Sequence, residues 1–192
     1  MMHPHSARAG GGRAAARGFS LIEVLVALTI IGVGMLGIAK IQALAYASTA
    51  TASLRSLAAI QAASLAAAMR GNHNYWSTAA AGAQQTINVT DNAVTASTDG
   101  ALIGSAVDCS LTVCNTTQLA AYDLAQWAAS LYTLLPSDTA VVVCQPPVTA
   151  NYPVGCSVTV SWIERRAGIN AQSSGPAATP MAAPSYTLYV EP

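Results

Sequence analysis

The chain has 192 residues, of which 53% are hydrophobic and only 8% are charged, and its eight basic side chains balance its eight acidic ones. That length suffices for one membrane-spanning helix and one small domain. Arg165 and Arg166 form the only cluster of Lys or Arg beyond residue 18, which argues against nucleic-acid binding.

The first 18 residues are rich in Gly and Ala and carry three arginines, Arg8, Arg13 and Arg17. An apolar run follows at residues 19–39, and its only charged residue is Glu23. A carboxylate at the centre of a bilayer costs about 2.5–3.5 kcal/mol on insertion scales, and ionisable groups in membrane segments usually have a function. Glu23 is therefore the first candidate functional residue.

Residues 17–23 read Arg-Gly-Phe-Ser-Leu-Ile-Glu and open the apolar run. This junction resembles the class III leader peptide of type IV prepilins. In that family a membrane-embedded prepilin peptidase cuts after the glycine and methylates the new N-terminal residue, and the glutamate guides subunit docking. The resemblance implies cleavage between Gly18 and Phe19, methylation of Phe19, and a docking role for Glu23.

Two other interpretations of this segment remain open. An ordinary secretory signal also has a basic start and an apolar core, and Ala43, Ala45 and Ala47 could supply its small-residue cleavage site. The second interpretation is a plain signal anchor in which the Glu is incidental. The placement of Glu23 favours the prepilin interpretation, because a secretory core has no use for a carboxylate.

One long helix is predicted over residues 19–70, because no proline interrupts it and Gly71 and Asn72 give a stop signal. At about 1.5 Å per residue it would extend roughly 78 Å, well beyond the hydrocarbon core of a bilayer. Its first half is apolar all round. In its second half an apolar stripe recurs at helical spacing and should pack on a globular domain; the stripe consists of Leu54, Ala58, Ala62, Leu65 and Met69.

Three glycines, Gly32, Gly34 and Gly37, interrupt the apolar half of this helix. Each costs about 1 kcal/mol relative to alanine in a helix interior. Close helix packing in a membrane is one explanation. The other, which the resemblance to pilins supports, is local unwinding inside an assembled fibre.

The stretch at residues 72–115 is polar and is expected to be largely loop, as in pilins. Within it, residues 86–90 alternate as a short strand, Asp91 and Asn92 signal a turn, and a second short strand is expected to follow. A second helix is predicted at residues 117–135, with N-cap candidates at 115–117 and Pro136 at its end. Its core positions repeat at helical spacing: Leu124, Trp127, Leu131 and Leu135.

Three further strands are predicted. Residues 140–144 form a β-branched run, and Val158, Val160 and Trp162 alternate with polar residues. Tyr186, Leu188 and Val190 alternate near the C-terminus, after a Pro- and Ala-rich loop at 167–184 that is expected to be mobile. Covering one face of a small antiparallel sheet with the amphipathic half of the first helix would bury both stripes. The predicted fold class is therefore α+β.

Four cysteines, Cys109, Cys114, Cys144 and Cys156, all follow the apolar segment. An even number fits two disulfides in an oxidising compartment. The positive-inside rule likewise places the arginine-bearing leader in the cytoplasm and the remainder in the periplasm. The spacing does not suit a structural zinc site, and no His lies nearby. Three connectivities are possible; we favour the local pairs, 109 with 114 and 144 with 156.

No constellation of catalytic residues is found, so we expect neither an enzyme nor a cofactor or metal. His73 is the single histidine beyond the leader, and it is interpreted as a surface residue. Arg165 and Arg166 are interpreted as a solvated strand end, with pairing to acids of a neighbouring subunit as the alternative. The aspartates are scattered, and turns and helix termini should explain most of them; they are Asp91, Asp99, Asp108, Asp123 and Asp138.

The order of motifs along most of the chain resembles the PilV group of minor pilins, the type IV pilus modification proteins. The motifs are the leader, the Cys pair, Tyr-Asp-Leu-Ala-Gln-Trp, Leu-Leu-Pro, then Cys-Ser-Val-Thr-Val-Ser-Trp and Arg-Arg. The long insertion before Tyr186 departs from that pattern and puts the geometry of the last strand in doubt.

This resemblance implies a cleaved leader (1–18), a long helix (19–70) with a membrane or fibre-core segment (19–39), and a periplasmic head (71–192). It implies a single-pass inner-membrane protein that enters a pilus on the cell surface, where it primes assembly or joins a tip complex. Its partners would be prepilin peptidase, other minor pilins, the major pilin and the inner-membrane assembly machinery. A minor pseudopilin of type II secretion, or a membrane-tethered periplasmic adhesin, are the alternatives. Twitching motility, adhesion and DNA uptake all remain open as roles.

Overall fold

The structure, a computed structural model, describes residues 18–104, 107–136, 138–147, 149, 152–164 and 183–192. The predictions for the leader arginines, for Arg165 and Arg166, and for most of the 167–184 loop lie outside these residues. The chain forms two compact units, Met1–Ala43 and Leu44–Pro192. Helix α1 (Leu21–Gly71) begins in the first unit and ends in the second, so the globular unit starts well before the predicted head boundary at residue 71.

Helix α1 agrees with the predicted long helix and begins two residues later. The backbone oxygen of Ser20 accepts hydrogen bonds from the N–H groups of Glu23, at 3.0 Å, and Val24, at 3.3 Å, which closes the first turn. The helix ends at Gly71, the predicted stop. Its amphipathic stripe is confirmed, because Ala58, Ala62, Leu65 and Met69 are buried and Leu54 is half-buried against the core.

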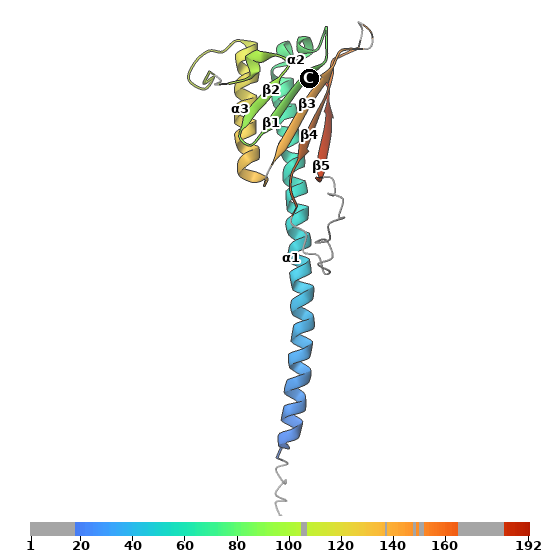
Figure 1. Cartoon of the computed structure of the whole chain (residues 1–192). Helices are drawn as coiled ribbons and strands as arrows, with labels where there is room; N and C mark the ends of the chain where they lie inside the picture. Colours follow the sequence, from blue (N-terminus) through green and yellow to red (C-terminus); the bar gives the residue numbers. More distant parts are fainter. Residues whose placement is uncertain (1–17, 105–106, 137, 148, 150–151, 165–182) are drawn as a thin grey trace, which may run out of the picture. The chain divides into compact units, whose positions relative to one another are not determined.

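The second unit holds a five-stranded antiparallel sheet with strand order β2-β1-β3-β4-β5 (Figure 1). The strands are β1 (Gln85–Thr90), β2 (Ala93–Ser97), β3 (Thr139–Gln145), β4 (Gly155–Ser161) and β5 (Ser185–Val190). The predicted α+β class and all five predicted strands are therefore confirmed. The turn between β1 and β2 places Asp91 at a φ of 56°, a left-handed conformation that Asp tolerates better than most residues.

The last strand keeps a regular position despite the insertion that precedes it. β5 pairs with β4 along its whole length, from Ser161 opposite Ser185 to Cys156 opposite Val190. The doubt that the insertion raised about this strand is thus removed. Val190 is buried, whereas Tyr186 and Leu188 are half-buried, as expected at the edge of a sheet.

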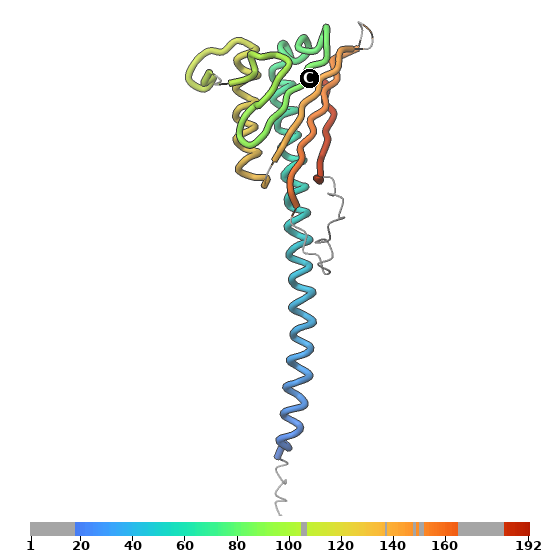
Figure 2. The backbone as a smooth tube through the Cα atoms, viewed as in Figure 1, coloured from blue at the N-terminus to red at the C-terminus, as the bar shows by residue number. Residues whose placement is uncertain are grey.

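Helix α3 (Thr116–Leu134) and the C-terminal part of α1 lie on the same face of the sheet (Figures 1 and 2). Asn115 caps α3: its side chain accepts from the Gln118 N–H at 2.8 Å, and the Gln118 side chain accepts from the Asn115 N–H at 3.0 Å. The predicted core positions of α3 are buried. Trp127 also donates from Nε1 to the backbone oxygen of Gln61 at 2.9 Å, which fastens α3 to α1.

Two short helices were not predicted, α2 (His73–Ala79) and the 3-10 turn η1 (Gly100–Leu102). Helix α2 follows α1 after a single residue, Asn72, whose side-chain amide donates to the Thr116 backbone oxygen at 2.7 Å. The Tyr75 and Trp76 rings of α2 meet edge-on and are buried. This helix therefore closes the end of the core where α1 stops.

Candidate functional site

The predicted processing site lies immediately before α1. Gly18, Phe19 and Ser20 have no regular secondary structure and are exposed. The Phe19 side chain is 83% exposed, and a Cβ added at Gly18 would meet no atom within 4 Å. No described residue therefore covers the Gly18–Phe19 peptide bond.

Glu23 lies in the first turn of α1, where the helix dipole favours a negative charge. Its side chain is exposed, and it makes no hydrogen bond or ion pair with a described residue. The residues that surround it on the helix are apolar and exposed, among them Ile22 and Val26. A carboxylate in such surroundings is available to a partner that supplies positive charge.

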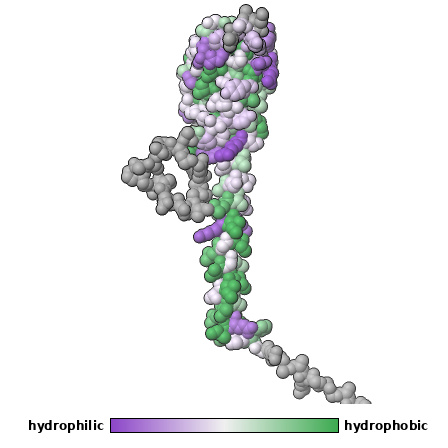
Figure 3. Space-filling view, turned by 90° about the vertical axis from the view of Figure 1, so that its right-hand side faces the viewer, coloured by the Kyte–Doolittle hydropathy of each residue, from purple (hydrophilic) through white to green (hydrophobic). Residues whose placement is uncertain are grey.

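The apolar part of α1 presents hydrophobic side chains along the face that Figure 3 shows, and every large hydrophobic residue from Leu21 to Ile41 is exposed. Its most apolar 18-residue window has a mean hydropathy of 2.5, and no residue of that window is buried. By length and composition the helix can cross a membrane, although signal sequences meet the same criterion. A Cβ at Gly32, Gly34 or Gly37 would meet nothing within 4 Å, so no contact among the described residues requires these glycines.

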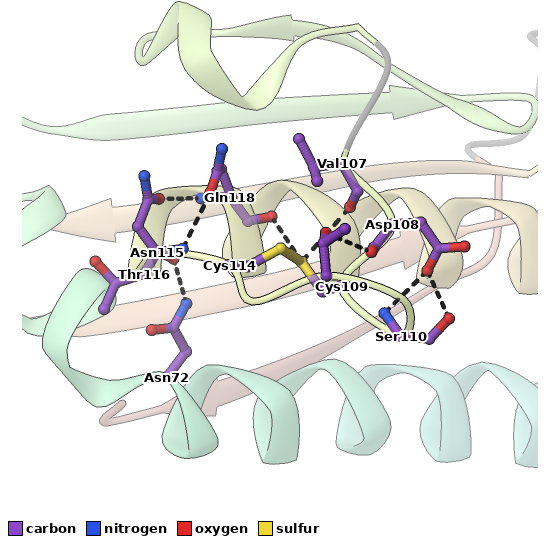
Figure 4. The surroundings of a disulfide bond; sticks show 10 residues. Asn72, Val107, Asp108, Cys109, Ser110, Cys114, Asn115, Thr116 and Gln118 are labelled. Atoms are coloured by element: carbon purple, nitrogen blue, oxygen red, sulfur yellow. Dashed lines mark hydrogen bonds between the residues drawn. A yellow bond between two sulfur atoms is a disulfide. The ribbon is translucent and has the colours of Figure 1, made fainter.

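Both disulfides of the structure join cysteines that are close in sequence. Cys109 bonds to Cys114 in the loop before α3 (Figure 4), and Cys144 bonds to Cys156. The second pair lies directly opposite in the register of β3 and β4, and both residues are buried. These are the local pairs that the sequence analysis favoured.

The aspartates divide into two groups. Asp91 lies in a turn, Asp99 caps η1 by accepting from the Ala101 N–H at 3.0 Å, and Asp108 accepts from the Ser110 N–H at 2.9 Å. Burial raises the pKa of Asp123 on α3. Asp138, just before β3, is 2% exposed, and neither of its carboxylate oxygens has a hydrogen-bond partner among the described residues. Turn and cap geometry therefore explains Asp91, Asp99 and Asp108, but not Asp123 or Asp138.

Two further polar contacts were not signalled by the sequence. Tyr75 donates from its hydroxyl to Asp99 Oδ2 at 2.7 Å, and burial together with this hydrogen bond raises the pKa of Tyr75. Arg55 donates from Nε to Glu164 Oε1 at 3.1 Å. Glu164 lies 109 residues further along the chain, which is why spacing could not reveal the pair.

No group of three or more metal-ligating side chains occurs within the described residues. His73 is exposed, and its Nδ1 lies 2.8 Å from a backbone oxygen of Pro192. The described part of the chain therefore offers no candidate metal centre.

The long N-terminal helix and the antiparallel sheet define a type IV pilin-like α+β fold. A family model for the prokaryotic N-terminal methylation motif matches residues 13–39, a segment that contains the predicted cleavage site and Glu23. No curated protein and no solved structure is significantly similar to the chain. The motif supports a type IV pilin or pseudopilin, that is, a structural subunit that prepilin peptidase processes and the pilus machinery assembles.

Proposed function

We propose that the chain is a minor pilin of a type IV pilus, similar to the PilV group. The precursor resides in the inner membrane with its arginine-bearing leader in the cytoplasm and its globular unit in the periplasm. Prepilin peptidase cuts between Gly18 and Phe19 and methylates Phe19. The mature subunit then enters the fibre beside other minor pilins and the major pilin, where it primes assembly or forms part of a tip complex.

The single observation that carries this proposal is the position of Glu23. Cleavage at Gly18 leaves a positively charged amine on Phe19, four residues before the only acid of the apolar segment. An unpaired carboxylate in an apolar surrounding is costly, whereas one paired with a cation is tolerated. Glu23 of one subunit pairs with the Phe19 amine of the next, so the cost of leaving Glu23 unpaired selects the register in which subunits stack.

The processing step is tested on the mature protein purified from membranes or pili. N-terminal sequencing and mass analysis should give a chain that begins at Phe19 and carries one extra methyl group. A mature chain that retains Arg17, or one that begins beyond residue 43, would overturn the proposal.

The docking role is tested with Glu23→Ala, using Val33→Ala as a matched control in the same apolar helix. Both variants should be cleaved and methylated normally, because neither touches the Gly18–Phe19 bond. We expect Glu23→Ala to be nearly absent from sheared pili and Val33→Ala to enter them as the native chain does. Normal entry of processed Glu23→Ala would show that the acid does not guide docking.

The gene neighbourhood and the deletion phenotype separate a minor pilin from a minor pseudopilin, which shares the leader and the helix. Loss of a minor pilin reduces the number of surface pili. Loss of a pseudopilin instead reduces the release of secreted enzymes and leaves pili intact.

A further inference from the structure

The loop at residues 108–114 presents apolar side chains to solvent. Leu111 is 81% exposed and Val113 is fully exposed, and both lie within the ring closed by the Cys109–Cys114 disulfide. Ile103 and Val107, shortly before the ring, are 45% and 41% exposed. Exposed apolar side chains that gather at one site usually mark an interaction surface.

This loop is held in one conformation by several bonds besides the disulfide (Figure 4). The Asp108 backbone oxygen accepts from the N–H groups of Leu111, at 3.2 Å, and Thr112, at 3.1 Å. The Asp108 side chain accepts from the Ser110 N–H and from its hydroxyl, at 2.9 and 2.6 Å. At its far end the loop runs into Asn115, the cap of α3. A surface fixed before binding loses little conformational entropy when a partner docks.

The charge around the loop indicates what kind of partner fits. Asp108 is the only charged residue of the loop, and no Lys or Arg occurs in residues 71–164. Asp108, at the base of the loop, is exposed, and its hydrogen bonds from Ser110 lower its pKa, so it carries a negative charge at neutral pH. Complementary charge across an interface steers binding and selects partners.

We propose that the 108–114 loop is a docking element that inserts Leu111 and Val113 into an apolar pocket of a second protein, rimmed by Lys or Arg. An anionic membrane surface is disfavoured as the occupant because Asp108 repels it. A second copy that used the same loop is disfavoured because the two Asp108 carboxylates would repel each other. This proposal does not depend on the processing of the leader, so it stands or falls apart from the proposed function.

The test is photo-cross-linking of the full-length protein in its own cells, with a benzophenone amino acid at Val113. The matched control carries the same amino acid at Tyr189, which is 79% exposed on β5. We expect Val113, and not Tyr189, to give one discrete protein adduct whose cross-linked peptide contains apolar residues next to Lys or Arg.

Two loop variants then measure the contributions of apolar contact and charge to the Val113 adduct. Leu111→Ser should lower the adduct yield about tenfold, as truncation of an apolar anchor at an interface does. Asp108→Asn keeps an acceptor for the Ser110 N–H but removes the charge. It should lower the adduct yield, and this yield should no longer depend on the salt concentration. Intact mass after thiol alkylation confirms that each variant keeps both disulfides, and if one does not, the other variant decides the question.

Four results would overturn the proposal: lipid adducts, adducts to a second copy, no adduct from correctly disulfide-bonded protein, or a partner site without Lys or Arg. Equal adduct yields from native and Leu111→Ser chains would do so as well, since they would show that the loop does not anchor the partner.

Discussion

Arg55 of α1 and Glu164, which follows β4, form an ion pair that joins two segments far apart in sequence. The Glu164 side chain is 2% exposed, whereas the Arg55 side chain is 61% exposed. Glu164 Oε1 also accepts from Trp162 Nε1 at 3.2 Å, and the hydrogen bond and the charge of Glu164 raise the pKa of Arg55. A nearly buried carboxylate is thus held between the long helix and the end of the sheet.

We expect Arg55→Ala to lower the urea midpoint of the second unit, because a nearly buried carboxylate would lose its facing cation. Unfolding in detergent can be followed by the fluorescence of Trp76, Trp127 and Trp162, which are all buried. Arg70→Ala is the matched control, since Arg70 has no ion pair with a described residue. Equal shifts for both variants would show that the pair contributes nothing specific.

Asp138 should destabilise the folded chain at neutral pH. Burial raises its pKa, and within the described part of the chain neither carboxylate oxygen has a hydrogen-bond partner. The folded state favours the protonated form of Asp138. The contribution of Asp138 to the free energy of unfolding is therefore most favourable below the pKa of an unfolded Asp, about 4. It becomes less favourable as the pH rises through the higher folded pKa.

Asp138→Asn should therefore raise the urea midpoint at pH 7.5, and this gain should shrink towards pH 4. The comparison variant is Glu191→Gln, which changes an exposed carboxylate after β5 and should alter the midpoint little at either pH. A loss of stability in Asp138→Asn at pH 7.5 would indicate that the carboxylate has a cationic partner in the native protein.

Much of this fold was predictable because its elements follow regular patterns. The apolar stripe of α1 repeats at helical spacing, and α3 has a cap at Asn115 and a stop at Pro136. Strands β1, β3 and β4 alternate buried and less buried residues. Each of these signals is local, so one sequence suffices to read it.

The features that sequence reasoning missed are too short or too long in range for such patterns. Helix α2 has seven residues, fewer than two full turns, and therefore shows no periodicity. The Arg55–Glu164 pair depends on how α1 meets the sheet. The isolation of Asp138 from partners is likewise visible only in three dimensions, since in the sequence it resembles any other Asp near a strand end.

Removal of the two disulfides should cost different amounts of stability. In the chain-entropy model a cross-link stabilises more when it closes a longer loop. The sequence separations are 12 for Cys144–Cys156 and 5 for Cys109–Cys114. We expect a loss of about 3 kcal/mol for the Cys144→Ala/Cys156→Ala pair and about 2 kcal/mol for Cys109→Ala/Cys114→Ala.

The Cys144 and Cys156 side chains are also buried, so their removal leaves a cavity that adds to this difference. Urea unfolding of each double variant measures both losses. A larger loss from the exposed 108–114 loop than from the β3–β4 pair would contradict this ordering.

The hydrogen bond from Trp127 Nε1 to the Gln61 backbone oxygen, 2.9 Å long, should stabilise the contact between α3 and α1 by a modest amount. Trp127→Phe keeps an aromatic ring but removes the donor, and Ser64 still donates to the same oxygen at 2.9 Å. We expect Trp127→Phe to cost about 1 kcal/mol for the lost hydrogen bond. Trp127→Ala, which also empties a core position, should cost about 3–5 kcal/mol.

Tyr132→Phe is the matched control for Trp127→Phe, because Tyr132 lies on the same helix but is 58% exposed. It should leave the urea midpoint almost unchanged, since surface substitutions away from special contacts rarely matter. If Trp127→Ala proved as mild as Tyr132→Phe, α3 would not be packed on α1 through this residue. Because Ser130 of α3 also donates from its hydroxyl to Gln61 Oε1 at 2.9 Å, the register between the two helices would then have to be fixed by that hydrogen bond or elsewhere along their contact.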